Sequence, residues 1–259
     1  MASRAVDIIN TGPSFTQADA DALNARFAGV DAASMLRALF VDGLLGRVAV
    51  VSSFGTESAV LLHLVAQADP TVPVIFVDTL KMFQETLDYR EELTERFGLV
   101  NSSVVQPDPA VLAEKDASGL RWSYDPDGCC EIRKVEPLKR AKRGLDSWIS
   151  GRKAFQSITR QNLPRFEIED GRLKINPLGD WTKDDLEAYF EAHDLPRHPL
   201  EAQGFLSVGC EPCTSPVAAG EDPRAGRWRG WDKTECGIHG PGDAPGDDGE
   251  LPPGYEPAF

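Results

Sequence analysis

The sequence of 259 residues lacks two features that would direct a chain to a membrane or to nucleic acid. No apolar run approaches the ~20 residues of a membrane-spanning helix, and the first residues form no apolar signal segment. Positive charge is also scarce, with 27 Lys and Arg against 41 Asp and Glu, a net charge of −14. Because nucleic acid and anionic membranes attract basic surfaces, we expect neither as a partner, and we expect a cytoplasmic protein.

Cysteine is scarce as well, and its number, five, is odd. A chain of this length can bury a sizeable core, so it does not need disulfides in order to fold. In a reducing compartment, the few cysteines favour metal binding or redox chemistry over a disulfide framework.

Strand-like and helix-like segments alternate along the chain. The apolar runs 47–51 and 73–77 predict buried strands, each followed by a helix, over 57–68 and 81–97. This alternation predicts an α/β fold with a parallel sheet covered on both faces, whose ligands bind beyond the carboxyl ends of the strands. The other predicted elements are helices over 17–29, 31–45 and 183–193, strands over 99–105 and 146–150, and a hairpin over 166–175.

The segment Ser52-Ser-Phe-Gly-Thr-Glu-Ser58 joins the first predicted strand to its helix. Backbone N–H groups at a helix N-terminus, together with several hydroxyls, can surround an anion. An ordinary helix cap would use only one or two of these residues. The segment has no Gly-Lys-Ser/Thr, so it is not a Walker motif.

Four of the cysteines form two groups, Cys129-Cys130 and Cys210-Glu-Pro-Cys213. This donor set is typical of a tetrathiolate metal site. Zinc sites usually use two C-x-x-C pairs, whereas adjacent cysteines suit a cluster with several iron corners. The pattern therefore favours an iron–sulfur cluster, and a zinc site or a redox dithiol remain alternatives. If residues 130–143 are helical, Lys134 lies near the sulfurs and could bridge to an anionic ligand.

The fifth cysteine, Cys236, stands in Lys233-Thr-Glu-Cys-Gly-Ile-His239, just before an acidic tail over 240–259 with five Gly and five Pro. The composition of that tail predicts disorder. Lys233 and His239 could lower the pKa of the Cys236 thiol, which makes it a candidate nucleophile. An incidental surface thiol is the alternative.

Together these motifs resemble the assimilatory adenylyl-sulfate (APS) reductases, the iron–sulfur branch of the family that also contains the 3′-phosphoadenylyl-sulfate (PAPS) reductases. The resemblance covers most of residues 47–240. It differs from the family's usual pattern at Leu80, where glycine is common. The matching segments are Ser52–Ser58, Val77-Asp-Thr79, Glu85-Thr86, Cys129-Cys130-x3-Lys134, Gly151-Arg152, Gln156-Ser157, Cys210-x2-Cys213, Gly220–Trp228 and Lys233–His239.

The resemblance implies an adenine-nucleotide α-hydrolase-like fold, related to the pyrophosphatase-loop enzymes. It implies attack by Cys236 on the sulfate sulfur of APS, loss of AMP, and release of sulfite by thioredoxin or glutaredoxin, with Lys134 and His239 as the other catalytic residues. Cys129, Cys130, Cys210 and Cys213 would bind a [4Fe–4S] cluster. The residues implied in substrate binding are Ser52, Ser53, Phe54, Gly55, Thr56, Glu57, Ser58, Asp78, Thr79, Arg152, Arg224 and Arg227.

The same motifs are also compatible with other functions. A PAPS reductase, or an enzyme that uses both substrates, differs only by a 3′-phosphate. More distant alternatives are a pyrophosphatase-loop ligase and a zinc-stabilised binding module. The expected organisation is N-terminal helices over 1–46, an α/β domain for nucleotide and cluster over 47–230, and a mobile C-terminal segment over 231–259. The N-terminal helices could also form a contact in a homo-oligomer.

Overall fold

The computed structural model describes residues 15–156, 163–233, 235 and 237. Within them lies a six-stranded sheet in the order β3-β2-β1-β4-β6-β5. Neighbouring strands run parallel except β5, which pairs antiparallel with β6. The predicted α/β fold with a mostly parallel sheet is therefore confirmed. The strands are β1 Val48–Val51, β2 Val74–Val77, β3 Ser102–Val105, β4 Ser147–Ser150, β5 Phe166–Glu169 and β6 Arg172–Ile175.

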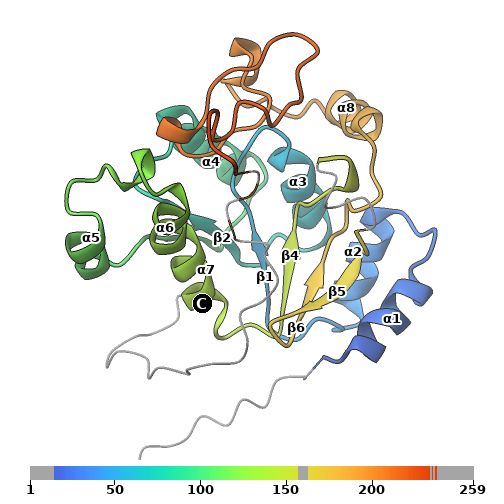
Figure 1. Ribbon diagram of the computed structural model, residues 1–259. Coiled ribbons are helices and arrows are strands. Elements are labelled where there is room, and N and C mark those ends of the chain that lie inside the picture. The colour runs from blue at the N-terminus through green and yellow to red at the C-terminus, as the bar shows by residue number, and fades with distance from the viewer. Residues whose placement is uncertain (1–14, 157–162, 234, 236, 238–259) are drawn as a thin grey trace, which may run out of the picture.

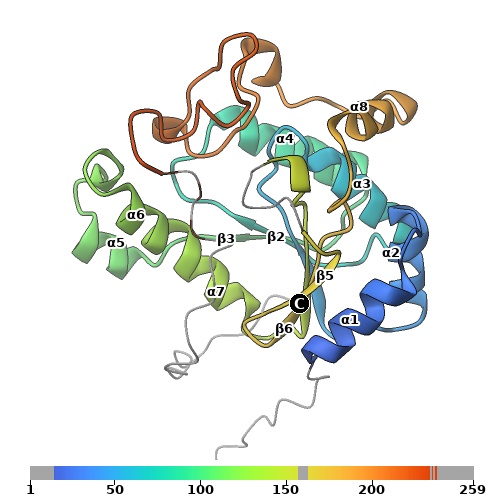
Figure 2. The ribbon, with the colours of Figure 1, turned by 45° about the vertical axis from the view of Figure 1, so that its right-hand side comes forward.

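Helices cover both faces of this sheet (Figures 1 and 2), as a parallel sheet requires. Figure 2 shows α5, α6 and α7 on one side of it, and α1 to α4 on the other. The helices are α1 Gln17–Arg26, α2 Ala32–Val41, α3 Ser58–Ala68, α4 Gln84–Arg96, α5 Pro109–Lys115, α6 Pro126–Cys130, α7 Glu136–Lys142 and α8 Lys183–Ala192. No helix in the described part of the chain is long and apolar enough to cross a membrane.

Successive strand residues supply two separate cores, because side chains along a strand point alternately to opposite faces. Val50, Phe76 and Ile149 belong to the larger core, which they share with apolar residues of α2, α3 and α8. Their neighbours Ala49 and Trp148 lie on the opposite face, in a smaller core with residues of the α7 region. The near-continuous apolar runs of the sequence are thus explained by burial on both faces.

Several helices are shorter than the sequence predicts. The helices predicted over 17–29 and 31–45 end at Arg26 and Val41, and Gly29 and Gly43 follow with φ of +72° and +63°. A left-handed residue of this kind commonly ends a helix. The short helix α5 was not predicted, because its seven residues are too few for a clear periodicity.

The helix predicted from Lys81 begins at Gln84 instead. Leu80 has a φ of +59°, a conformation that favours glycine. This explains why glycine is common at this position in the family that the sequence resembles. Met82 then forms an isolated β-bridge with Cys210. This bridge is incompatible with a helix, so the first residues of the predicted helix belong to the loop after β2.

The carboxyl ends of the strands open toward the top of Figure 1, where residues 201–230 lie over them. Two contacts fix this arrangement. The Thr56 hydroxyl in the loop after β1 donates to the Leu206 carbonyl at 3.1 Å, and the Glu211 N–H donates to the Lys81 carbonyl at 2.8 Å. Distant parts of the chain therefore meet at this edge.

At the opposite ends of β1 and β4, Arg47 and Asp146 form a clamp. The Asp146 carboxylate accepts hydrogen bonds from the Arg47 backbone N–H at 2.8 Å and from its guanidinium at 2.9 Å and 3.1 Å. The Asp146 side chain is 4% exposed. The hydrogen bonds from Arg47 hold the pKa of this carboxyl below its usual range, against the effect of burial.

We expect the substitution Asp146→Asn to lower the free energy of unfolding at pH 7 by about 1–3 kcal/mol. Because the folded-state pKa is depressed, this stabilisation is present above the unfolded pKa of about 3.9 and is lost as the pH falls through the folded value. Urea unfolding of both proteins between pH 3 and 7 should show their difference shrink below about pH 4. A difference that does not vary with pH would mean that the charge of Asp146 contributes nothing.

Candidate active site

The loop after β1, for which the sequence predicts anion binding, turns sharply before the start of α3. Phe54 adopts a φ of +49° and its ring is fully buried, packed edge-on against Phe76 with ring centroids 5.5 Å apart. The Phe54 N–H donates to the Ser52 hydroxyl at 3.2 Å. Glu57 precedes the first turn of α3 without a side-chain capping bond. The buried ring therefore anchors a turn that leads directly into a helix N-terminus.

In the loop after β2, the two predicted site residues point to different partners. The Asp78 carboxylate accepts from the Leu80 N–H and from the Gln106 side-chain amide, both at 2.9 Å. The Thr79 hydroxyl lies 3.2 Å from the Cys210 sulfur. It also accepts from the Lys81 N–H at 3.3 Å, which leaves its proton free for the sulfur. Thr79 thus links this loop to the cysteines.

Cys129, Cys130, Cys210 and Cys213 line one common cavity. The first two lie at the end of α6, and the other two bracket the short turn Glu211–Cys213. Adjacent cysteines do not prevent this convergence, because the loop from 210 approaches both. Within the described part of the chain, no group of three or more His, Cys, Asp or Glu side chains is arranged to hold a metal ion.

Positive charge surrounds the sulfurs, since Lys81, Arg133 and Lys134 line the same cavity. Burial and the neighbouring thiols raise the pKa of Cys129 to about 12. Burial also acts to raise the pKa of Cys210, but the charge of Lys134 and the hydrogen bond from Thr79 outweigh it, so that this pKa is lowered. Four clustered thiols, of which three are buried, cannot all ionise unless further positive charge joins them.

A π-helical turn over Glu131–Val135 follows the cysteine pair. It buries Ile132, Arg133 and Lys134 in succession. The Arg133 guanidinium donates to the Asp116 carboxylate at 2.7 Å and 3.0 Å, and to the Thr79 carbonyl at 2.9 Å. Lys134 lies close enough to Cys210 to shift its pKa, so the expected proximity of this lysine to the sulfurs is observed.

The three predicted anion-binding arginines lie in two places. Arg227 lies near the cysteines, because its positive charge helps to lower the pKa of Cys210. Its guanidinium carbon lies 4.6 Å from the ring centre of Trp228. Arg224 pairs with Glu235 at 3.2 Å. Arg152 instead follows β4 and pairs with Glu167 at 2.9 Å.

The turn after β4 is joined to the loop after β1. The Lys153 ammonium, buried to 2% exposure, binds the Glu57 carboxylate at 2.9 Å. This contact brings the Arg152 region beside the candidate anion loop. Among the predicted residues of that loop, Ser52, Phe54, Gly55 and Thr56 are buried, Glu57 and Ser58 are half-buried, and Ser53 is exposed.

Two predicted catalytic residues, Cys236 and His239, lie outside the described residues. The chain just before them is attached beside the cysteine cavity. The Lys233 ammonium pairs with Asp127 on α6, and its nitrogen lies 5.4 Å from the Trp228 ring centre.

Sequence reasoning missed Asp116, Arg133 and Glu167. Nothing in the spacing of Asp116 and Arg133 marks them as partners, because they are joined only by the fold. Glu167 and Glu169 did carry a signal, since two acids at alternate positions of a predicted strand share one face and require cationic partners.

Comparison with known proteins supplies independent findings. Residues 47–216 match the phosphoadenosine phosphosulfate reductase domain. The adenosine 5′-phosphosulfate reductase of Mesorhizobium japonicum is 52% identical over 78% of this chain and 78% of its own. The phosphoadenosine 5′-phosphosulfate reductase of Gloeobacter violaceus is 41% identical over 74% of this chain and 82% of its own.

Solved structures agree on the fold. The phosphoadenylyl-sulfate reductase of Candida auris, in a phosphate complex, superposes with a TM-score of 0.67 at 27% identity, covering 79% of this chain and 99% of its own. The FMN adenylyltransferase of Candida glabrata has a TM-score of 0.51 at 14% identity, covering 76% of this chain and 71% of its own, and shares the fold alone.

Proposed function

The chain belongs to the phosphoadenosine phosphosulfate reductase family, and on that premise we propose that it reduces adenylyl sulfate (APS) to sulfite and AMP. One observation carries this proposal. At one edge of the sheet, the loops after β1 and β2 both contact the segment 201–213, and Thr79 contacts Cys210 in a cavity that all four cysteines line. Relatives named adenosine 5′-phosphosulfate reductase at 52% and 51% identity support the choice of substrate.

In the proposed reaction, the Cys236 thiolate attacks the sulfate sulfur. The bond between that sulfur and the bridging oxygen breaks, and AMP leaves with the electron pair. The product is an S-sulfocysteine on the enzyme. A thiolate of thioredoxin or glutaredoxin then attacks the Cys236 sulfur, and sulfite leaves with the electron pair of the sulfur–sulfur bond. The second thiol of the reductant attacks the resulting mixed disulfide and releases the Cys236 thiolate, so that the two electrons come from the reductant. Thioredoxin or glutaredoxin as the partner and the cytoplasm as the location remain predictions.

The residues of the site have separate tasks in this proposal. The turn Ser52–Ser58 holds the phosphosulfate with backbone N–H groups and hydroxyls, aided by the N-terminus of α3. Lys134, Arg152, Arg224 and Arg227 neutralise the charge that builds up as AMP departs. Asp78 and Thr79 border the adenosine side, and His239 assists ionisation of Cys236.

The four cysteines form a donor set that fits a [4Fe–4S] cluster. They line one cavity, the described residues of its lining include no acid or imidazole, and cations beside the sulfurs can offset thiolate charge. A cluster presents several iron corners, so its ligands need not converge on one ion. Bound there, it would set the charge beside the sulfate.

An anaerobic assay of sulfite release tests the substrate, with APS and PAPS supplied at matched concentrations and thioredoxin as reductant. We expect APS to turn over and PAPS to react at least about tenfold more slowly, a difference of about 1.4 kcal/mol in barrier. Equal or faster reaction with PAPS would mean that the pocket admits a 3′-phosphate and that the enzyme is a PAPS or dual reductase. Absence of sulfite from both would refute the proposal.

The substitution Cys236→Ser tests the nucleophile. It should abolish sulfite release and formation of the S-sulfo intermediate, because a serine hydroxyl is a far weaker nucleophile than a thiolate. Binding of APS, measured by calorimetry, should stay within about twofold of the parent. Retained turnover would remove Cys236 from the mechanism.

Iron and acid-labile sulfide analysis of anaerobically purified protein tests the cofactor. We expect about four of each per chain and a visible absorption band that Cys210→Ser bleaches, because ligand loss and local unfolding are coupled. Cys236→Ser is the matched control and should keep both. Zinc without sulfide would instead support the binding-module alternative.

A further inference from the structure

Arg152 is held in a defined orientation from one side. One terminal nitrogen of its guanidinium donates to the Glu167 carboxylate at 2.9 Å, and its side chain is 13% exposed. Its Nε atom is buried and has no hydrogen-bond partner among the residues that the structure describes. A guanidinium that uses one nitrogen for an internal carboxylate retains other N–H donors for contact with an anion.

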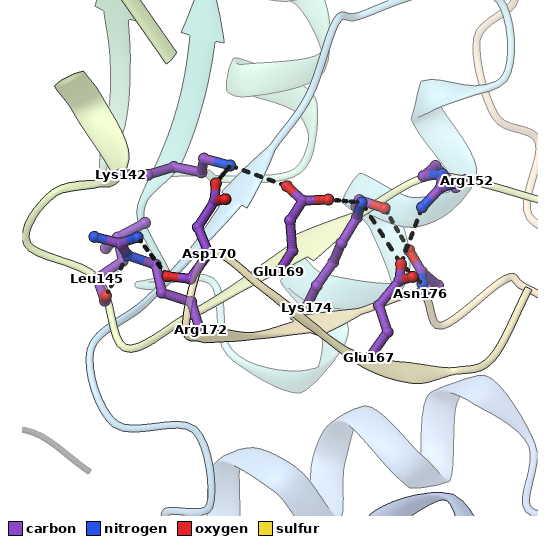
Figure 3. Close-up of polar contacts among 10 residues, drawn as sticks. Lys142, Leu145, Arg152, Glu167, Glu169, Asp170, Arg172, Lys174 and Asn176 are labelled. Atoms are coloured by element: carbon purple, nitrogen blue, oxygen red, sulfur yellow. Dashed lines mark hydrogen bonds and ion pairs between the residues drawn. The ribbon is translucent and has the colours of Figure 1, made fainter. Parts of the chain in front are cut away.

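Glu167 is itself fixed by two further side chains (Figure 3). The same carboxylate oxygen accepts from the Asn176 amide at 2.8 Å and lies 3.5 Å from the Lys174 ammonium. Asn176 is in turn held by the Ser150 hydroxyl at 2.6 Å and by the Pro164 carbonyl at 3.0 Å. The carboxylate that orients Arg152 therefore has little freedom of its own.

Ion pairs continue from Glu167 along the hairpin of β5 and β6, with acidic and basic side chains in alternation. Lys174 is fully buried opposite Glu167 in the strand register, and its ammonium also binds Glu169. Glu169 binds the Lys142 ammonium at 3.1 Å, and Asp170 lies 3.9 Å from that ammonium at the far end (Figure 3). Because Lys174 contacts both glutamates, the charge of Glu167 is shared between Lys174 and Arg152, and Glu167 holds Arg152 without fully neutralising it.

We propose that Glu167 is a positioning residue for substrate binding: it orients the Arg152 guanidinium so that its remaining N–H donors can contact the phosphosulfate group, and Lys174 and Asn176 hold the carboxylate in place. This inference rests on the proposed function, since it needs an anionic substrate at Arg152. Its energetic basis is preorganisation, because an arginine that is already oriented loses less side-chain freedom when the anion binds.

Calorimetric binding of APS to the full-length, cluster-loaded Cys236→Ser protein tests this inference without turnover. In that background, Arg152→Ala should weaken binding at least about tenfold, and Glu167→Ala about fivefold. The double variant should bind no more weakly than Arg152→Ala alone, within about twofold, because Glu167 acts through Arg152. Glu167→Gln keeps a hydrogen-bond acceptor and should restore most of the affinity.

Glu187→Ala is the matched control, since it also removes a carboxylate from an arginine, at an ion pair of 2.5 Å with Arg197. It should leave the dissociation constant within about twofold of the parent. Additive losses in the double variant, or weakening by Arg152→Ala but not by Glu167→Ala, would overturn the inference. Unchanged binding of APS by the Arg152→Ala variant would also overturn the inference, because Arg152 would then make no contact with the substrate for Glu167 to position. Failure of the Cys236→Ser parent to bind APS would instead refute the proposed substrate.

Discussion

Four clustered thiols, three of them buried and Cys213 half-buried, set the strongest constraint on this structure, because thiolate charges cannot coexist in one cavity without compensation. Burial and the neighbouring thiols raise the pKa of Cys129 to about 12, which disfavours its thiolate. Burial also disfavours the thiolate of Cys210, but Lys134 and Thr79 stabilise it and lower its pKa. The loops that carry the cations and the Thr79 hydroxyl place these groups where they can compensate thiolate charge.

The support for those cations is also buried and also charged. Arg133 lies beside the sulfurs, and its charge is matched by Asp116, whose side chain is fully buried. The same guanidinium holds the Thr79 carbonyl, so one ion pair fixes both the helical turn and the loop after β2. A buried ion pair repays its desolvation only when its hydrogen bonds are complete, and this one has several.

A second charged system lies at the other side of the candidate site, where Lys153 meets Glu57 and Arg152 meets Glu167. A protein with a net charge of −14 thus gathers positive groups at one edge of its sheet and pairs several of them with internal acids. For a polyanionic substrate, such an edge offers local attraction that the overall charge opposes.

Much of the site was predictable because its signals are local. The apolar runs of β1 and β2 predicted parallel strands. Ser52–Ser58 and Asp78-Thr79 come directly after the carboxyl ends of these strands in the sequence. The helix predicted over 183–193 begins at Lys183, where Thr182 and Asp185 form both capping hydrogen bonds. Lys134 was expected near the sulfurs from its helical spacing. The start of α4 was predicted wrongly, because the bridge between Met82 and Cys210 is a long-range contact that no local pattern encodes.

By itself, the sequence determined the alternation of strands and helices, the two cysteine groups and the family motifs, all of which depend on residues close together in the chain. Only the tertiary structure decided that Thr79 contacts Cys210, that Asp116 balances Arg133 and that Glu167 pairs with Arg152. The physical reason is that a buried charge or sulfur must find its partner in space. The order of the strands in the sheet, not the order of residues in the chain, selects that partner.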